Sequence, residues 1–398
     1  MSLELSVKAQ AVKPSSTLAI TARVKELKSQ GIDVVGFGAG EPDFNTPYNI
    51  NEAAIHAINE GFTRYTPASG TEELKIAVSR KFKEFNHIDY KPEQIVVSNG
   101  GKHSLTNVFS AILNPGDEVI IPAPYWLSYP EIVQLASGTP VFVRAAKSAN
   151  YKVTAKQIEE ACTKRTKAVI INTPNNPSGM IYTREELEDI ATIAVQKDIY
   201  VVSDEMYENL VYGEEKHISI ASLNEEIYKR TITCCGVSKS YAMTGWRIGY
   251  TGSAAEIAGL MGSIQSHQTS NPNTIAQKAA TEALNGSQET VALMNEEFNR
   301  RREYIVQRIK KMSYIDALTP LGAFYLFADV SGVLSKCYKN ERIGNVNRLI
   351  DILLKDFRVV VIPCEDFGFA DHIRLSYAIS MEQIEKGLDR IEDFLTQL

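Results

Sequence analysis

Short apolar runs alternate with helix-forming segments through the middle of this chain of 398 residues. The runs are rich in valine and isoleucine, and turn residues or amphipathic segments separate them. Such an alternation predicts a mainly parallel sheet between layers of helices, which is an α/β fold. We expect strands at 94–97, 118–121, 141–144, 168–172, 199–203 and 231–235, and helices at 102–113, at 154–162 and after the capping box of Thr183 and Glu186.

The last quarter of the chain has a different pattern, which predicts a smaller α+β domain. One hydrophobic core rarely serves so long a chain, so two domains are expected. We place a large domain at residues 48–290 and a small domain at residues 1–47 and 291–398. The elements expected in the last quarter are helices at 295–312, 345–355 and 381–398 and strands at 323–330, 359–362 and 372–377.

Composition excludes several classes of function. Hydrophobic residues make up 44% and charged residues 23% of the chain, as in soluble globular proteins. The net charge of −6 argues against nucleic-acid binding, and no apolar run is long enough to cross a membrane. The N-terminus shows no signal peptide, and five cysteines form no disulfide framework, so we expect a reducing cytoplasm. The six histidines lack metal-ligand spacing, so no metal site is expected.

The most specific motif runs from Gly236 to Gly249 and reads GVSKSYAMTGWRIG. It places Lys239 just past the end of an apolar strand, where a solvated surface charge is unusual. A desolvated lysine can lose its proton and become a Schiff-base nucleophile. Arg247 supplies a planar cation suited to phosphate. Together the two residues indicate an aldehyde cofactor that carries a phosphate, which is pyridoxal 5′-phosphate.

Ligands of open α/β sheets bind outside the carboxyl ends of the strands, so the residues that follow each expected strand test for a site. Gly101 and Lys102 open a helix, whose N–H groups bind phosphate. Trp126 can stack on a ring, and Asp204 can pair with a protonated pyridine nitrogen. The remaining candidates are Asn176 and Tyr207 as donors to the ring's phenolic oxygen and Ser238 as a phosphate ligand.

With these residues in place, the sequence resembles the class I aminotransferases of pyridoxal-phosphate fold type I, and especially the bacterial aspartate aminotransferases of subgroup Ib. The similarity covers nearly the whole chain, and the lysine motif is fully matched. Two further motifs of the family are matched by Asn176-Pro-Ser-Gly and Asp204-Glu-Met-Tyr207. The resemblance implies that Arg374 and the backbone of Gly40 bind the substrate's α-carboxylate. It also implies that Tyr65 binds the cofactor phosphate of a neighbouring subunit, which makes a homodimer with shared sites.

The sequence departs from the family pattern at two places. Many relatives carry a second phosphate-binding serine three residues before the lysine, where this chain has Gly236. Subgroup Ia enzymes bind the distal carboxylate of the substrate with a partner arginine, and residues 266–272 contain none. In subgroup Ib a lysine and an N-terminal threonine do this work, and the matching residues are Lys102 and Thr17. Their presence favours a dicarboxylate substrate.

The resemblance implies an aspartate:2-oxoglutarate aminotransferase that works through an aldimine on Lys239. The freed amine of Lys239 would move a proton from Cα of the substrate to C4′ of the cofactor, and oxaloacetate and glutamate would be the products. Related functions stay open, namely an aromatic, prephenate or kynurenine aminotransferase or a carbon–sulfur lyase. A non-enzymatic regulator that binds the cofactor is a further alternative, but the enzyme-like pattern starts by Lys13 and leaves no room for an N-terminal DNA-binding region.

Several of the chosen residues also have purely structural interpretations. Trp126 and Tyr65 can be packing residues, and Arg374 can form an interdomain salt bridge. Lys102 can be a solvated charge at a helix start and Thr17 a helix cap. In isolation Asp204 can be a cap and Asn176 a turn former. Their shared position at strand ends is what favours the functional interpretation.

Overall fold

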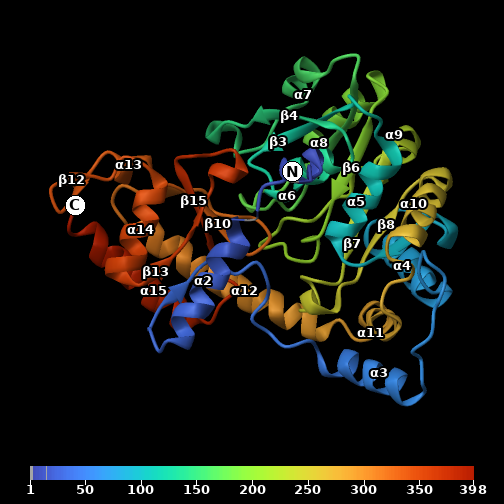
Figure 1. Cartoon of the computed structure of the whole chain (residues 1–398), viewed down its shortest axis with the longest axis horizontal. Helices are drawn as coiled ribbons and strands as arrows, with labels where there is room; N and C mark the ends of the chain where they lie inside the picture. Colours follow the sequence, from blue (N-terminus) through green and yellow to red (C-terminus); the bar gives the residue numbers. More distant parts are fainter. Residues whose placement is uncertain (1–2, 15) are drawn as a thin grey trace.

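A computed structural model describes residues 3–14 and 16–398, so residues 1, 2 and 15 of the expected small domain lie outside the described part. Its largest element is a seven-stranded sheet (Figure 1). Six strands run in one direction, and only the second strand in spatial order is antiparallel to its neighbours. The spatial order is β2 (Ile95–Ser98), β8 (Gly249–Gly252), β7 (Thr231–Gly236), β6 (Tyr200–Asp204), β5 (Thr166–Asn172), β3 (Glu118–Ala123) and β4 (Thr139–Arg144).

Helices cover both faces of this sheet, because alternate residues of the central strands are apolar on both sides. In β5, Ala168 and Ile170 pack with one helical layer, and Val169 and Ile171 pack with the other. The α/β prediction is therefore confirmed. The first layer contains α5 (Gly101–Ile112), α6 (Ser128–Leu135) and α10 (Ala255–Gln268), and the second contains α7 (Ala155–Ala161), α8 (Arg184–Gln196) and α9 (Glu225–Arg230).

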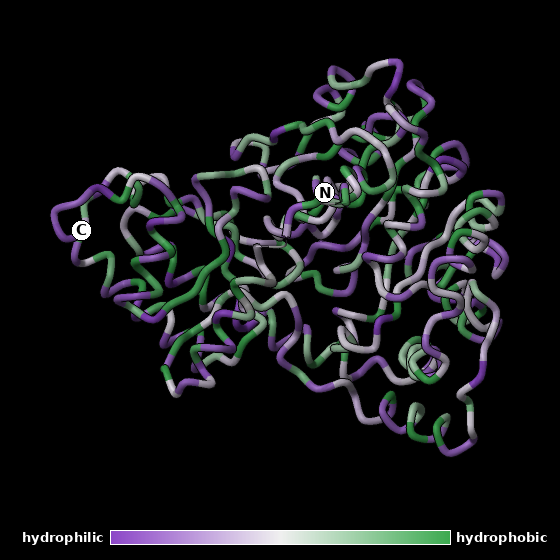
Figure 2. The backbone as a smooth tube through the Cα atoms, in the orientation of Figure 1, coloured by the Kyte–Doolittle hydropathy of each residue, from purple (hydrophilic) through white to green (hydrophobic). Residues whose placement is uncertain are grey.

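The expected start of α8 is present. Thr183 caps the helix, its hydroxyl accepts from the N–H of Glu186 at 3.3 Å, and the carboxylate of Glu186 accepts from the N–H of Thr183 at 2.8 Å. The outer helices alternate between hydrophilic and hydrophobic residues along the chain, as expected for elements with one face in water (Figure 2). A third cluster of apolar residues joins β2 and β8 to α3 (Tyr48–Asn59), α4 (Glu72–Phe85) and α11 (Thr274–Asn285).

The C-terminal part forms a second, antiparallel sheet in the order β14 (Ile362–Pro363), β15 (His372–Ser376), β10 (Tyr325–Asp329) and β9 (Asp316–Ala317). Three helices pack on it, namely α12 (Glu289–Ile309), α14 (Val346–Phe357) and α15 (Met381–Leu395). The expected strand at 359–362 is wrong as a single element. Val359–Val360 is strand β13 and pairs with β1 (Val35–Gly36), whereas Ile362 and Pro363 pair with β15.

The N-terminal segment lies beside this C-terminal part. The parallel pairing of β1 with β13 joins the two, and α2 (Ser16–Ser29) packs near β1 (Figure 1). The exact domain boundaries at residues 47 and 290 stay a prediction. The smaller elements of the chain are α1 (Val7–Gln10), α13 (Ser331–Leu334) and the hairpin of β11 (Cys337–Tyr338) and β12 (Glu341–Arg342). No described helix is both long and apolar enough to cross a membrane.

Candidate active site

A cavity of about 340 Å³ opens at the carboxyl end of the large sheet, where the second sheet approaches it. Its size lies in the range of small-molecule sites. Residues from five strand ends and from both sheets line it. Of the thirteen residues selected from the sequence, twelve line this cavity, namely Thr17, Gly40, Gly101, Lys102, Trp126, Asn176, Asp204, Tyr207, Ser238, Lys239, Arg247 and Arg374.

Tyr65 is the exception, since 90% of its surface is exposed in the single chain and it is not part of the cavity wall. It lies between α3 and α4. An exposed tyrosine is compatible with the expectation that this residue serves a neighbouring subunit, and this expectation stays untested by the single chain.

Lys239 lies three residues past the end of β7 and is half-buried in the cavity. Its ammonium donates to the carbonyl oxygen of Gly40. Burial lowers the pKa of Lys239 to about 8, the charge of Glu41 opposes the shift, and Arg374 and Arg247 add to it. About a tenth of this amine is therefore unprotonated at pH 7, far more than for an ordinary lysine, so it can act as a nucleophile and as a base.

Asp204 is the last residue of β6, and only 7% of its surface is exposed. Burial raises the pKa of its carboxyl to about 6, and hydrogen bonds from Tyr129 and from the N–H of Met206 limit the rise. The Tyr129 hydroxyl donates to Oδ2 at 2.6 Å, and the N–H of Met206 donates to Oδ1 at 3.2 Å. Tyr129 was not predicted, although its position one helical turn after Trp126 gives it access to the same cavity.

A chain of hydrogen bonds connects Asn176, Tyr207 and Arg374. The Asn176 amide donates to the Tyr207 hydroxyl at 3.4 Å, and Nη1 of Arg374 donates to Oδ1 of Asn176 at 3.0 Å. Burial and the neighbouring Tyr325 keep the pKa of Tyr207 well above its ordinary value, so its hydroxyl stays protonated. Tyr325 lies 3.0 Å from Tyr207, oxygen to oxygen, and nothing in its sequence context identified it.

Arg374 is buried in the middle of β15, with 3% of its surface exposed. Nη2 donates to the carbonyl oxygen of Gly38 at 3.4 Å, but Nε finds no hydrogen-bond partner among the described residues. A buried guanidinium N–H without an acceptor is costly, and a carboxylate fits it. The guanidinium also lies 4.3 Å from the ring centroid of Tyr325, which fixes its plane.

The opposite end of the cavity is suited to a phosphate. Helix α5 begins at Gly101 with no side-chain cap and no acidic residue in its first turn, as far as the described residues go, so its positive end meets no protein anion. Arg247 lies at the same end of the cavity. Its guanidinium is held by hydrogen bonds to the carbonyl oxygens of Thr244 at 2.8 Å and Asn99 at 3.4 Å. Ser238 is buried in the wall beside it.

Glycines allow this close packing. A Cβ at Gly249 in β8 would lie 2.4 Å from the backbone nitrogen of Gly101, and a Cβ at Gly100 would lie 2.3 Å from Nη2 of Arg247. Gly100 also has a φ of +87°, which favours glycine. At Gly236 a Cβ would lie 3.0 Å from the carbonyl oxygen of Ile248. The absence of a hydroxyl there leaves the phosphate end to the other residues.

Two more cavity residues were missed from the sequence. Asn172 ends β5, and its side-chain oxygen accepts from the N–H of Asn176 at 2.9 Å. Its strand-end position was a usable signal. Met206 lines the wall near α5, where a Cβ added at Gly101 would lie 2.4 Å from its Cε. The remaining additions to the wall are Gly38, Ser128, Cys234 and Thr244.

Comparisons with known proteins identify the family of this chain. The model of the family "Aminotransferase class I and II" matches residues 32–391. The aspartate aminotransferase of Bacillus sp. (strain YM-2) is 50% identical over 98% of this chain and 99% of its own length. The aspartate/prephenate aminotransferase of Nitrosomonas europaea (strain ATCC 19718) is 43% identical over 99% of this chain and all of its own length.

Among solved structures, the aspartate aminotransferase of Thermus thermophilus with maleate superposes with a TM-score of 0.93 and 41% identity. The match covers 98% of this chain and 100% of that one. Fold and sequence thus agree over the whole molecule, and the expected fold type I is confirmed. The chain belongs to the class I and II aminotransferase family.

Proposed function

We propose that this chain is an aspartate:2-oxoglutarate aminotransferase that uses pyridoxal 5′-phosphate. The observation that carries the proposal is the position of Lys239, whose half-buried amine shares one cavity with the buried carboxylate of Asp204 and the guanidinium of Arg374. Few cofactors need an amine, an anion and a phosphate site in one cavity. The names of the full-length relatives agree with this assignment.

The residues of the cavity fit the cofactor. Gly101 at the start of α5, Ser238 and Arg247 would hold the phosphate, and Asp204 would hold the ring nitrogen. Asn176 and Tyr207 would donate to the ring's phenolic oxygen. Bound pyridoxal phosphate supplies an aldehyde that condenses with amines and a ring that withdraws electrons from the substrate's Cα.

The protein's own groups would then perform three tasks. Arg374 binds and orients the α-carboxylate of the substrate, because its Nε has no hydrogen-bond acceptor among the described residues and a carboxylate oxygen would provide one. Lys239 accepts the proton from Cα, because a pKa of about 8 gives useful base strength near neutrality. Asp204 keeps a negative charge opposite the ring nitrogen, because Tyr129 and the N–H of Met206 bind its two carboxylate oxygens.

The distal end of the substrate would meet Lys102 and Thr17. Both line the cavity, and the Lys102 ammonium lies 5.1 Å from the Trp126 ring centroid. Burial and then the charge of Arg247 lower the pKa of Lys102, so an anionic partner is favourable there. The Thermus thermophilus relative was solved with maleate, which has two carboxylates, and this supports a dicarboxylate substrate.

A substrate screen with 2-oxoglutarate as acceptor tests the proposal. We expect kcat/KM for aspartate to exceed that for alanine or phenylalanine by about 100-fold or more. Lys102→Met raises KM for aspartate about tenfold and leaves alanine unaffected, because only aspartate has a distal carboxylate. Equal rates for aspartate and alanine in the natural protein would contradict the assignment.

A second candidate is an aspartate/prephenate aminotransferase, because a relative with 43% identity carries that name. Prephenate as amino acceptor belongs in the same screen. We further propose a cytoplasmic homodimer in which Tyr65 reaches the partner's cavity. Its support is that Tyr65 and three residues of α3, namely Tyr48, Ile55 and Ile58, are exposed in the single chain although they are large and apolar.

A further inference from the structure

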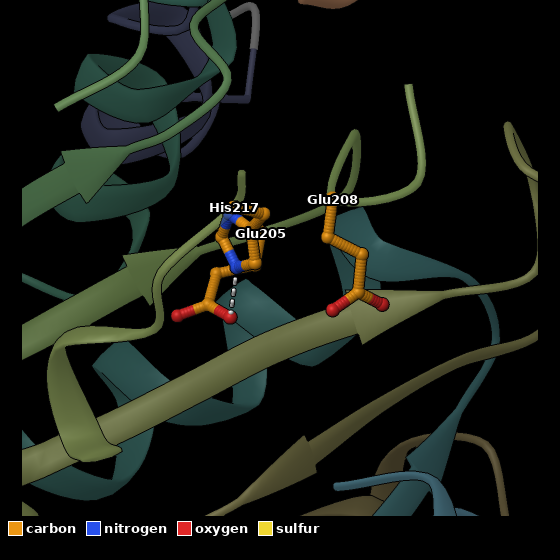
Figure 3. Close-up of side chains that lie close together, drawn as sticks. All are labelled: Glu205, Glu208 and His217. Carbon is orange, nitrogen blue, oxygen red and sulfur yellow. Dashed lines mark hydrogen bonds and ion pairs between the residues drawn. The ribbon is translucent and has the colours of Figure 1, made fainter. Parts of the chain in front are cut away.

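A buried polar cluster lies behind the segment that carries Asp204 and Tyr207. Within the described chain those two residues line the cavity, whereas Glu205 and Glu208 do not and are buried instead, with 0% and 3% of their surfaces exposed. Figure 3 shows both carboxylates near the imidazole of His217. Asp204 and Tyr207 are therefore each followed directly in the chain by a residue with a buried carboxylate.

Four donors hold the carboxylate of Glu205. Its Oε1 accepts from Ser203 at 2.7 Å and from Ser219 at 2.6 Å, and its Oε2 accepts from His217 at 2.8 Å and from Asn86 at 3.2 Å. Burial raises the pKa of Glu205, but the charge and hydrogen bond of His217 and the two serines outweigh it, so the pKa lies below its ordinary value. Glu205 is thus a fixed buried anion.

Glu208 is held in the same way from another element. Lys81 of α4 forms an ion pair with it, and the Asn86 amide donates to Oε2 at 2.8 Å. The side chain of Lys81 is only 10% exposed. Ligand atoms of Glu205, Glu208 and His217 lie within 4.8 Å of one another, as in a metal site, but the protein's own ammonium already supplies the cation. The cluster is therefore an anchor built from paired charges.

We propose that Glu205 and Glu208 are positioning residues, which clamp residues 204–208 to α4 and its C-terminal end and so fix the Asp204 carboxylate and the Tyr207 hydroxyl in the cavity. The inference rests on the proposed function, because it concerns the groups that would bind the cofactor ring. The buried charge of Glu205 also acts electrostatically on its surroundings. It raises the pKa of Asp204, and it should likewise favour a bound proton on the cofactor.

The groups around this anchor determine the sign of any electrostatic effect. Asp204 and Glu208 belong to the same segment, and the other titratable or charged groups come from six further segments. They are Lys81 of α4, Tyr90 before β2, Cys234 and Cys235 of β7, His217 of the loop after β6, Tyr241 of the β7–β8 connection and Tyr250 of β8. Loss of the negative charge of Glu205 should disfavour protonation of the bound cofactor, and loss of the positive charge of Lys81 should favour it.

The test uses the protein loaded with pyridoxal phosphate and follows the absorbance of the bound cofactor against pH. The measured quantity is the pH at the midpoint of the absorbance change. We expect Glu205→Gln to lower this midpoint by about 0.5 pH unit and Lys81→Gln to raise it by a similar amount. Dissociation constants for pyridoxal phosphate, measured by fluorescence on cofactor-free protein, should rise about tenfold in Glu205→Gln, since Asp204 loses its fixed position.

Glu118→Gln is the matched control. Glu118 is buried in β3 of the same sheet and paired with Arg165 and Thr163, but it does not touch the cavity. Its loss should leave the midpoint and the affinity unchanged. Midpoints that stay unchanged, that move in one direction in both variants, or that move equally in the control would overturn the inference. If Glu205→Gln does not fold, the direction found with Lys81→Gln alone decides.

The same measurements separate this inference from the proposed function. A natural protein that binds no pyridoxal phosphate would overturn the proposed function. A natural protein that binds the cofactor and transaminates, with variants that behave like Glu118→Gln, would overturn the positioning role alone.

Discussion

Lys239 destabilises the folded protein without cofactor, because folding places its amine where the charged form is disfavoured. Its pKa falls from an ordinary 10.5 to about 8. Between these two values the unfolded chain binds more protons than the folded chain, so stability rises as pH rises from 8 to 10.5. Below pH 8 the full penalty is present.

We therefore expect Lys239→Met to be more stable than the natural chain at pH 7, without cofactor, and to lose this advantage by about pH 10.5. Urea unfolding of both proteins at a series of pH values measures the difference. Lys278→Met is the control, since Lys278 pairs with Glu73 outside the cavity. An advantage of Lys239→Met that persists unchanged at high pH would contradict the assigned cause.

Tyr129 limits the pKa of Asp204 through a single hydrogen bond of 2.6 Å. Tyr129→Phe removes the donor and leaves the ring in place, so burial should raise the pKa of Asp204 further above about 6. We expect kcat/KM to fall about tenfold, and the acid limb of the pH–rate profile to move to higher pH. Tyr182→Phe, a buried tyrosine bonded to the backbone of Val153, should leave the profile unchanged.

At the scale of elements, the contact between β8 and the start of α5 shapes the end of the cavity where we propose that the cofactor phosphate binds. Gly249→Ala would place a Cβ 2.4 Å from the backbone nitrogen of Gly101 and 2.5 Å from the backbone carbon of Gly100. Backbone cannot move aside as a flexible side chain does, so α5 must shift. We expect a loss of about 1–3 kcal/mol in the free energy of unfolding and weaker binding of pyridoxal phosphate.

Gly245→Ala is the matched control for this change. It lies in the β7–β8 connection, four residues before Gly249, and a Cβ there has no atom within 4 Å among the described residues. Thermal unfolding and fluorescence titration with the cofactor compare the two variants. Equal affinity in both would show that the β8–α5 contact does not shape the site.

The strands that could be predicted from sequence are those with continuous β-branched runs. Strands β5, β6 and β7 lie within one or two residues of expectation, because each is buried on both faces and its sequence shows it. Strand β8 was missed, since its four residues include two glycines and carry no hydrophobic run. The run at 359–362 was predicted as one strand, but its residues pair with two different sheets, which is tertiary information.

The candidate site divides in the same way. Residues just past predictable strands, such as Asp204 and Asn176, were found because parallel strands bring their ends together. Tyr325 was not found, because it comes from the second sheet and only the approach of the two sheets places it 3.0 Å from Tyr207. Motif resemblance supplied Arg374, whose role no local pattern indicates.

At the scale of the whole molecule, a single chain presents a cavity whose wall lacks Tyr65, a predicted cofactor residue with 90% of its surface exposed. If two chains share their sites, Lys239 of one chain and Tyr65 of the other serve the same cavity. A protein with Lys239→Ala and a protein with Tyr65→Ala should each have little activity. A hybrid of the two has one cavity with both residues intact and one with neither.

We expect unfolding and refolding of an equal mixture to restore roughly a quarter of the natural activity, because half of randomly formed dimers are hybrids with one intact site. A mixture of Lys239→Ala with Asp204→Ala is the control. Both of those residues line the cavity of the same chain, so no hybrid contains an intact site and no activity should return. Equal recovery in both mixtures, or none in the first, would place Tyr65 outside the partner's site and leave its exposure to be explained by another contact.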